Sequence, residues 1–429
     1  MKMVKSLLLG AAAGLVAVAG AQAADLPVKA KPVQYVKICS LYGAGFYYMP
    51  GTDTCIKIGG FLRAEMNFNS NGSFNPFKVA DLDSRGLNFE TTRARAVATF
   101  DVRSQTEYGT LRSYMAIGEQ VTNTDGGSGV DTYSHRMFIQ WAGFTAGLAV
   151  SFFDFYSTPK YSNTTNVLGS DTGGSGDPVF GYTAQLGGGF SATISAEDTS
   201  VRRTAISGGG GYAGRQWPDI VANLRIDQAW GGAQIMGAAH QVRTVGVVGV
   251  PDQEFDDVGY AVGAGVKLNL PWGKGDSVAA QVGYAKGALK YVGSGLGSFR
   301  ISHGTADVGV GDAFDAVVTN GGTDLDLTEG WSVVAGADHH WNSQWKTSLY
   351  GTYGQIMFSD AASTALRGAA DGDWKFWQVG SRTVWSPVRN LDLSVDVMYN
   401  HLNTGFESLG FQDEGWWQGM FRVQRNFYP

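Results

Sequence analysis

The stretch Leu391-Asp392-Leu393-Ser394-Val395-Asp396-Val397-Met398-Tyr399-Asn400 alternates with a period of two: its odd positions are apolar and its even positions are mostly polar. Successive side chains of a β-strand point to opposite faces, so this pattern predicts a strand with one apolar face and one wet face. The same alternation recurs at residues 190–197, 220–227 and 258–270. Strands of this kind are the main elements that the sequence indicates.

The composition excludes several classes of protein. Gly accounts for 61 of 429 residues, about twice the usual share, whereas Pro is 11 and Cys is 2, which does not fit a collagen, a Pro-rich linker or a disulfide scaffold. A hydrophobic content of 44% argues against disorder. The formal net charge of -6 gives little reason to expect a nucleic acid as partner.

Residues 1–23 have the layout of a secretory signal peptide. Lys2 and Lys5 precede an apolar run at 7–20, which closes on the small-residue triplet 21–23. We expect cleavage between Ala23 and Ala24. The alternative is a membrane anchor, but the run is short for a helix that needs about 20 residues to span a bilayer.

Two cysteines, Cys39 and Cys55, lie 16 positions apart in the segment that follows. In an oxidising compartment they are able to close a small structural loop, which stabilises a fold by about 3 kcal/mol on the chain-entropy model. A metal-binding pair and two free thiols are the alternatives. We expect residues 24–54 to form an N-terminal periplasmic segment with this disulfide, and residues 55–429 to form the main domain.

Strand patterns and turn residues divide that domain into sixteen strands. We predict them at 55–68, 88–103, 109–119, 134–143, 146–154, 180–187, 190–198, 219–229, 232–243, 257–270, 277–286, 330–340, 344–358, 374–385, 391–401 and 415–427. Seven short turns alternate with eight long loops rich in Gly, Ser, Asn and Asp. Phe144-Thr145 is one of the predicted short turns.

An even number of strands of about ten residues, with short turns at one end and long loops at the other, is typical of a transmembrane antiparallel β-barrel. Closure of the barrel also removes unpaired strand edges, which lipid does not tolerate. The alternative is a large secreted, soluble all-β protein. Tryptophans at or beside five of the seven short turns favour the barrel, because an aromatic girdle lies at a membrane interface. These are Trp141, Trp230, Trp272, Trp341 with Trp345, and Trp385.

Two ends of the chain carry a family resemblance. The segments Tyr35-Val36-Lys37-Ile38-Cys39, Tyr42-Gly43-Ala44-Gly45-Phe46 and Cys55-Ile56-Lys57-Ile58-Gly59-Gly60 resemble the opening of alphaproteobacterial outer-membrane porins. The ending Arg422-Val423-Gln424-Arg425-Asn426-Phe427 is similar to the last strand of that family. The resemblance implies a homotrimeric general-diffusion channel of sixteen strands in the outer membrane, with short periplasmic turns, long extracellular loops and the third long loop folded into the lumen.

The polar phase of each strand predicts the lining of the lumen. In a closed barrel the last strand pairs with the first, so the basic residues of five adjacent strands form one positively charged wall. Its predicted members are Arg63, Arg93, Arg95, Arg112, Arg136 and Arg422. The alternative is that arginines only fill space in the lumen and pair with nearby acids.

The third long loop runs from about residue 152 to residue 178 and contains Asp154, Asp171 and Asp177. Because the resemblance implies that this loop folds inward, we expect these acids to form an edge that faces the basic wall. The alternative is an ordinary solvated loop. The acids of the loop at 287–329 are expected to be solvated surface, facing lipopolysaccharide, without a dedicated metal site.

These patterns together predict passive diffusion of small hydrophilic solutes and ions. The alternative is a channel selective for a sugar or carboxylate class. An enzyme is disfavoured, because none of the six histidines lies in a metal-protease motif or beside a nucleophile elbow. We expect no cofactor and no metal, and as partners two further copies of the chain, outer-membrane lipid and lipopolysaccharide.

Overall fold

The computed structural model describes residues 37–69, 74, 88–124, 127–163, 176–247, 250–293, 296–297, 299–303, 306–368 and 371–427. The predicted signal peptide, its cleavage site between Ala23 and Ala24, and Asp171 lie outside the described residues. In the described part of the chain no helix is long and apolar enough to cross a membrane.

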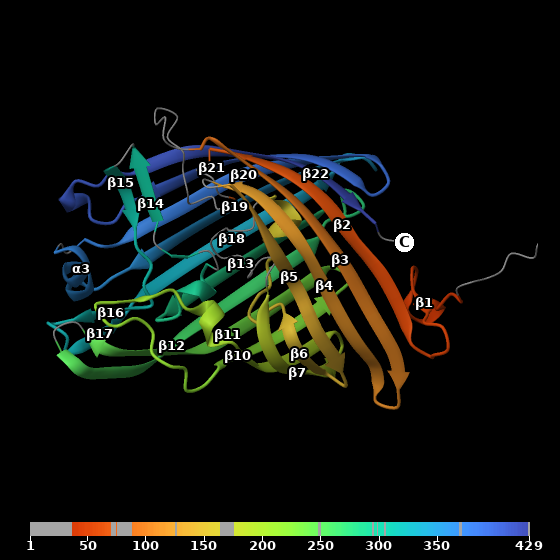
Figure 1. Cartoon of the computed structure of the whole chain (residues 1–429), viewed down its shortest axis with the longest axis horizontal. Coiled ribbons are helices and arrows are strands. Elements are labelled where there is room, and N and C mark those ends of the chain that lie inside the picture. The colour runs from red at the N-terminus through yellow and green to blue at the C-terminus, as the bar shows by residue number, and fades with distance from the viewer. Residues whose placement is uncertain are drawn as a thin grey trace, which may run out of the picture.

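The described strands form a closed antiparallel barrel (Figure 1). Its sixteen strands are β2 (Cys55–Phe68), β3 (Glu90–Thr106), β4 (Gly109–Thr124), β5 (Gly127–Trp141), β6 (Phe144–Ala149), β7 (Asp177–Gly187), β8 (Phe190–Glu197), β10 (Asp219–Gln228), β11 (Gly231–Val247), β12 (Val250–Asn269), β13 (Ser277–Lys286), β18 (Glu329–His340), β19 (Trp345–Met357), β20 (Trp374–Val388), β21 (Leu391–Asn403) and β22 (Glu414–Asn426). Each strand pairs with the next one, and β22 pairs with β2, so that Arg63 lies opposite Gln424 and Glu65 opposite Arg422. The predicted fold class and strand number are confirmed.

Smaller elements lie mostly in the long loops, at one end of the barrel. They are η2 (Thr199–Arg202), β9 (Ile206–Ser207), η3 (Leu289–Tyr291), β14 (Phe299–His303), β15 (Ala306–Gly311), β16 (Ala316–Thr319), β17 (Asp324–Leu327), α3 (Asp360–Arg367) and η4 (Glu407–Leu409). Strands β14 to β17 and α3 cluster at this end, whereas β1 (Tyr47–Tyr48) lies at the opposite end with the short turns (Figure 1). The long loops therefore cover one mouth of the barrel.

The alternation read from the sequence sorts side chains between the two faces of the wall. In β2 the apolar Ile58, Leu62 and Met66 are between 36% and 56% exposed, while Glu65 and Asn67 on the other phase are buried. The tryptophans beside the short turns are also exposed on the barrel. An apolar outer surface with a polar interior is the arrangement that lipid requires.

Two boundaries near β5 and β6 were predicted wrongly. The turn lies at Ala142-Gly143 and not at Phe144-Thr145, because both residues take a positive φ, of 48° and 90°, as a tight two-residue hairpin turn requires. The strand predicted at 146–154 ends at Ala149, since the chain leaves the wall there and turns into the barrel.

The described N-terminal segment is fastened to the turn end of the barrel. Cys39 and Cys55 form a disulfide with a Cα–Cα distance of 6.1 Å, and both are buried with Phe46. η1 (Ser40–Tyr42) follows the first cysteine, and Cys55 begins β2. The Arg103 guanidinium lies over the Phe46 ring, 5.0 Å from its centroid. The predicted disulfide is confirmed.

Candidate pore constriction

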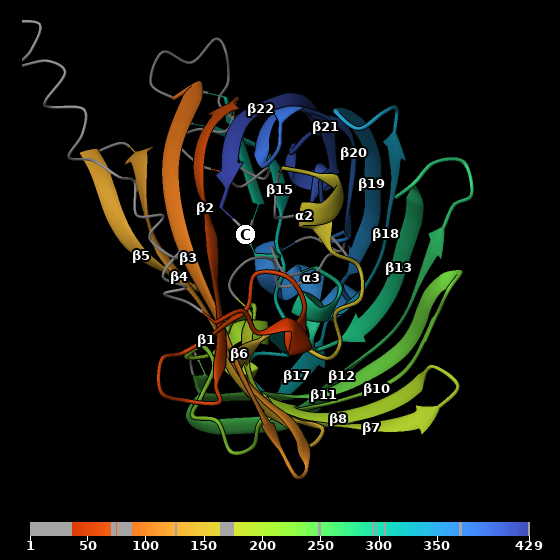
Figure 2. The ribbon, with the colours of Figure 1, turned by 90° about the vertical axis from the view of Figure 1, so that its right-hand side faces the viewer.

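Loop L3, residues 150–176 between β6 and β7, runs inside the barrel where it is described. Its short helix α2 (Thr158–Tyr161) lies within the ring of strands (Figure 2). The Asn223 side-chain amide donates to the Phe152 carbonyl over 2.6 Å, and Gln281 Oε1 accepts from the backbone amides of Phe155 and Tyr156. The third long loop therefore folds into the lumen, as the family resemblance implied.

Two glycines of the wall make room for this loop. A Cβ atom at Gly265 would lie 2.3 Å from Cδ1 of Phe155, and one at Gly336 would lie 2.5 Å from the Tyr156 hydroxyl. Real Cβ contacts are not that short, so a larger residue at either position would push L3 away from the wall. The small side chains of β12 and β18 are thus part of what positions the loop.

The far end of the described loop is fixed to β21. Asp396 accepts hydrogen bonds from the Ser162 hydroxyl over 3.0 Å and from the Asn163 backbone amide over 2.5 Å. The Tyr350 hydroxyl donates to the same carboxylate from β19 over 2.7 Å. L3 is therefore attached at several points along the inner wall.

The two described acids among those predicted for the third long loop, Asp154 and Asp177, do not form an open edge. Arg202 of η2 binds Asp154 over 3.1 Å and Asp177 over 2.9 Å, and all three side chains are at most 2% exposed. Although burial alone would lower the pKa of Arg202, the two carboxylates raise it above its usual value. Asp154 and Asp177 were expected to form an edge that faces the basic wall, but both lie in a buried ion-pair cluster around a single arginine; Asp171 lies outside the described residues.

A cavity of about 240 Å³ separates L3 from one side of the barrel wall. We call it the constriction cavity. Its lining residues are Arg63, Arg95, His135, Pro159, Asn163, Lys346, Arg382, Val384, Asp392, Ser394, Arg422 and Gln424.

Three of the six predicted wall arginines line this cavity: Arg63, Arg95 and Arg422. A fourth, Arg93, lies behind them and binds Glu65 over 2.6 Å. The Glu65 carboxylate is fully buried and also contacts Arg63 and Arg422, at 3.7 and 2.5 Å. One carboxylate therefore holds three arginines of the wall in place.

The remaining two predicted arginines are not among the described residues that line the cavity. Arg112 binds Asp101 over 3.0 Å and donates to Gln140 over 3.0 Å, which brings it close to Arg103, the other partner of Asp101. Arg136 donates to the His135 carbonyl over 2.5 Å. The structure thus brings part of the predicted wall together at the cavity and directs the rest to neighbouring partners.

Sequence reasoning missed Lys346 on β19 and Arg382 on β20. Arg382 NH1 donates to the carbonyls of Pro159 and Ser162, over 3.1 and 3.0 Å, so this arginine holds L3. Lys346 Nζ lies 3.7 Å from Asp338. The alternation of these two strands could have placed both residues on the inner face. Lys346 lies two positions from Ser348, and Arg382 four positions from Gln378, so each shares a face with a buried polar residue.

Lys160 adds a further cation on L3 itself. Its Nζ donates to Ser277 over 2.7 Å and lies 3.9 Å from Asp338. Burial lowers the pKa of Lys160 below its usual value, and the positive charge of Lys267 acts in the same direction. Positive charge therefore occurs on both the wall and the loop.

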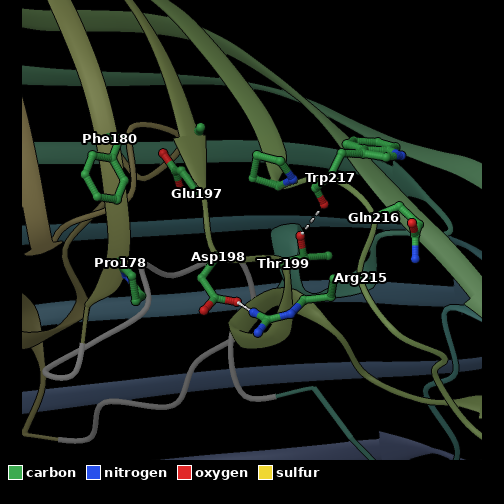
Figure 3. A pocket seen from close by; sticks show the side chains of 10 residues that line it. Pro178, Phe180, Glu197, Asp198, Thr199, Arg215, Gln216 and Trp217 are labelled. Carbon is green, nitrogen blue, oxygen red and sulfur yellow. Dashed lines mark hydrogen bonds and ion pairs between the residues drawn. The ribbon is translucent and has the colours of Figure 1, made fainter.

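A different hollow, of about 430 Å³, lies at the loop ends of β7, β8 and β10 (Figure 3). Two of its charged side chains pair with each other, since Arg215 binds Asp198 over 2.5 Å. Phe180 and Ala196 line this hollow and also an adjoining apolar one of about 500 Å³ on the outer face of the barrel. We assign this region to the outer surface and not to the channel.

Comparison with known proteins decides the family. The model of a porin subfamily matches residues 25–419. The chain belongs to this porin subfamily. It is an outer-membrane β-barrel protein, and the resemblance to alphaproteobacterial outer-membrane porins is confirmed.

Individual relatives of this porin agree with that assignment. It is 33% identical over 248 residues to porin Omp2b of Brucella canis and 32% identical over 248 residues to porin Omp2b of Brucella melitensis, in both cases over 53% of this chain. The match spans 63% of the length of these curated relatives, which is less than two thirds.

Solved structures share the fold at low identity. The outer membrane channel DcaP of Acinetobacter baumannii superposes with a TM-score of 0.66 and 16% identity, covering 89% of this chain and 99% of that one. The trimer form of OmpT of Vibrio cholerae superposes with a TM-score of 0.50 and 8% identity, covering 88% of this chain and 100% of that one. At such identities the likeness concerns the fold alone.

Proposed function

We propose that this porin is a water-filled channel for passive diffusion of small hydrophilic solutes and ions across the outer membrane. The observation that carries the proposal is the constriction cavity, a space lined almost entirely by polar and charged side chains inside a closed barrel. A polar lumen closed to lipid gives hydrated solutes a path, and its narrowest part sets their size. Membership of a porin subfamily indicates a channel and not an enzyme.

We further propose that three copies assemble, as the family resemblance implies. Strands β6 and β8 have only 6 and 8 residues, whereas a strand tilted by about 45° needs about 9–11 residues to cross the hydrocarbon layer. We call the part of the barrel from β6 to β8 the low wall. Its short strands would leave unpaired backbone groups of the neighbouring strands facing lipid, which is costly. Contact with a second copy would cover it.

The outer surface of the low wall supports this assembly. Its large side chains include Phe180 at 71% exposure, Ile194 at 60% and Phe144 at 57%. They line the apolar hollow of about 500 Å³ on the outer face. Exposed apolar side chains occur all around the outer face, where lipid covers them; here they surround a concavity that side chains of a second copy would fill.

Swelling of proteoliposomes tests the channel. The full chain, reconstituted into liposomes loaded with an impermeant polymer, is expected to give swelling in isosmotic sugar at a rate that falls steeply from a pentose to a disaccharide to a trisaccharide. Liposomes with heat-unfolded protein serve as the control. Swelling equal to this control, from protein shown to be folded and inserted, would contradict diffusion through the barrel.

A further inference from the structure

We infer that the constriction cavity is a saturable binding site for small oxyanions that carry two negative charges, such as a dicarboxylate or inorganic phosphate. The inference rests on the proposed channel and names the class of solute that its narrowest part retains. It is carried by the convergence of five cationic side chains on one small cavity.

The five cations come from neighbouring strands. Lys346 is on β19, Arg382 on β20, Arg422 on β22, Arg63 on β2 and Arg95 on β3, and these strands are consecutive in the barrel apart from β21 between β20 and β22. They form an arc, which L3 closes with Pro159 and Asn163. A solute in the cavity thus meets positive charge from several directions.

Among the described lining residues, positive charge exceeds negative charge. Asp392 is the single carboxylate among the lining residues, and it already accepts a hydrogen bond from the Ser386 hydroxyl over 2.6 Å. Glu65 lies behind the wall and is shared among Arg63, Arg93 and Arg422. An incoming dianion would add negative charge to a lining that, in the described part of the chain, is mainly cationic.

Neutral groups help to hold three of these cations in position, in addition to the carboxylates that contact Arg63, Arg422 and Lys346. Arg422 donates to the Asn163 carbonyl over 2.6 Å, and Arg382 donates to the carbonyls of Pro159 and Ser162. Arg95 Nε and NH2 bind the Gln120 amide oxygen over 3.1 and 2.6 Å. Groups ordered in advance lose little freedom when a ligand binds, which improves affinity.

The chemistry of these groups selects the ligand. A guanidinium matches carboxylate and phosphate oxygens with paired hydrogen bonds, and a second negative charge engages a second cation. The volume of about 240 Å³ is below the range of about 300–1,000 Å³ that holds drug-sized ligands, so it suits a small metabolite. The described lining residues include no Phe, Tyr or Trp, so they offer a sugar no such ring to stack on.

Titration of single channels tests the inference. The full chain is inserted into a planar bilayer in KCl, and succinate or phosphate is added at constant ionic strength, with acetate and glucose as comparison solutes. We expect each divalent oxyanion to reduce the KCl current with a saturating concentration dependence, and acetate and glucose to leave it nearly unchanged. Whichever of succinate and phosphate has the lower half-saturating concentration is the better fit to the site.

Variants locate the effect. Arg382→Gln and, separately, Lys346→Gln are each expected to raise the half-saturating concentration about tenfold, as for the loss of one charge-assisted hydrogen bond. The control is Arg425→Gln on β22. Arg425 is exposed, lies three positions after Arg422 and therefore on the opposite face of the strand, and is not among the residues that line the cavity. This variant should give the same titration as the parent protein.

The outcomes separate the two proposals. A KCl-conducting pore that neither succinate nor phosphate blocks in a saturable way overturns the inference and leaves the channel standing. Equal block in the parent protein and in both cavity variants also overturns it, because the site would then lie elsewhere. A folded, inserted protein without KCl conductance overturns the proposed channel and this inference together.

Discussion

Glu65 shows how one buried side chain organises the basic wall. Its carboxylate is fully buried and lies within 3.7 Å of three guanidiniums, two of which come from the strands paired on either side of β2. A buried charge is tolerated only when it is paired, and removing one partner of such a pair leaves the other uncompensated. The seam where the barrel closes, between β22 and β2, depends on this residue.

Glu65→Gln should therefore lower the thermal stability of the barrel. We expect a loss of about 3–5 kcal/mol, the usual cost of breaking a buried ion pair by removing one partner. The control is Glu329→Gln, because Glu329 pairs with Lys286 over 2.9 Å but is 39% exposed, and exposed pairs contribute about 0–1 kcal/mol. Loss of the β-sheet circular dichroism signal on heating in detergent is the measurement; equal shifts in the two variants would contradict this role of Glu65.

For single residues, the sequence predicts the face of the barrel wall to which a side chain points, but not its ion-pair partner. Alternation alone placed Arg63, Arg95 and Arg422 on the inner face, and they line the cavity. It did not predict that Asp154 and Asp177 would bind Arg202, because that arginine belongs to another loop. Ion-pair choice depends on which loops meet in three dimensions, and no local pattern encodes it.

Loop L3 is the element on which the size of the pore depends. Its described part is attached to the wall through hydrogen bonds from β10, β13, β20 and β21, and the glycines of β12 and β18 let it lie close. Asp396 makes the densest of these attachments, because its two oxygens accept from Ser162, Asn163 and Tyr350. The position of the loop is therefore determined by side chains of strands that are distant from it in the sequence.

Asp396→Ala should loosen the constriction. The loop loses two hydrogen bonds to a charged acceptor, each of which contributes about 1.5–3 kcal/mol. We expect a higher single-channel conductance with larger current fluctuations, and faster entry of a trisaccharide into liposomes. Asp227→Ala is the control, since Asp227 pairs with Arg225 and is 59% exposed. Conductance and fluctuations that match those of the control would show that Asp396 does not hold the loop.

Elements differ in how far the sequence predicts them. All sixteen strands were predicted within a few residues at most ends, since alternation and turn residues are local signals, and β2 and β13 agree at both ends. The inward path of L3 followed only from the family resemblance. Its composition of Gly, Ser and Asp is that of any solvated loop, and the attachments that fix it lie up to 259 residues away in the chain.

At the scale of the whole molecule, a closed barrel with a polar cavity and one low wall accounts for both proposals on function. Closure between β22 and β2 gives every strand of the described barrel a neighbour on both sides, and the apolar outer phase faces lipid. The low wall at β6 and β8 is where lipid contact would be least favourable. The proposed trimer, with one constriction in each copy, would cover this low wall with protein.

Single-channel recording in a planar bilayer tests this account most directly. The full chain in KCl is expected to insert in large steps and to close in three equal steps, one for each constriction, with a reversal potential under a salt gradient that indicates anion preference from the cation-lined cavity. Insertion of folded protein without conductance would contradict the account. So would one undivided conductance level with a preference for cations, because neither three separate constrictions nor the cationic cavity would then control the current.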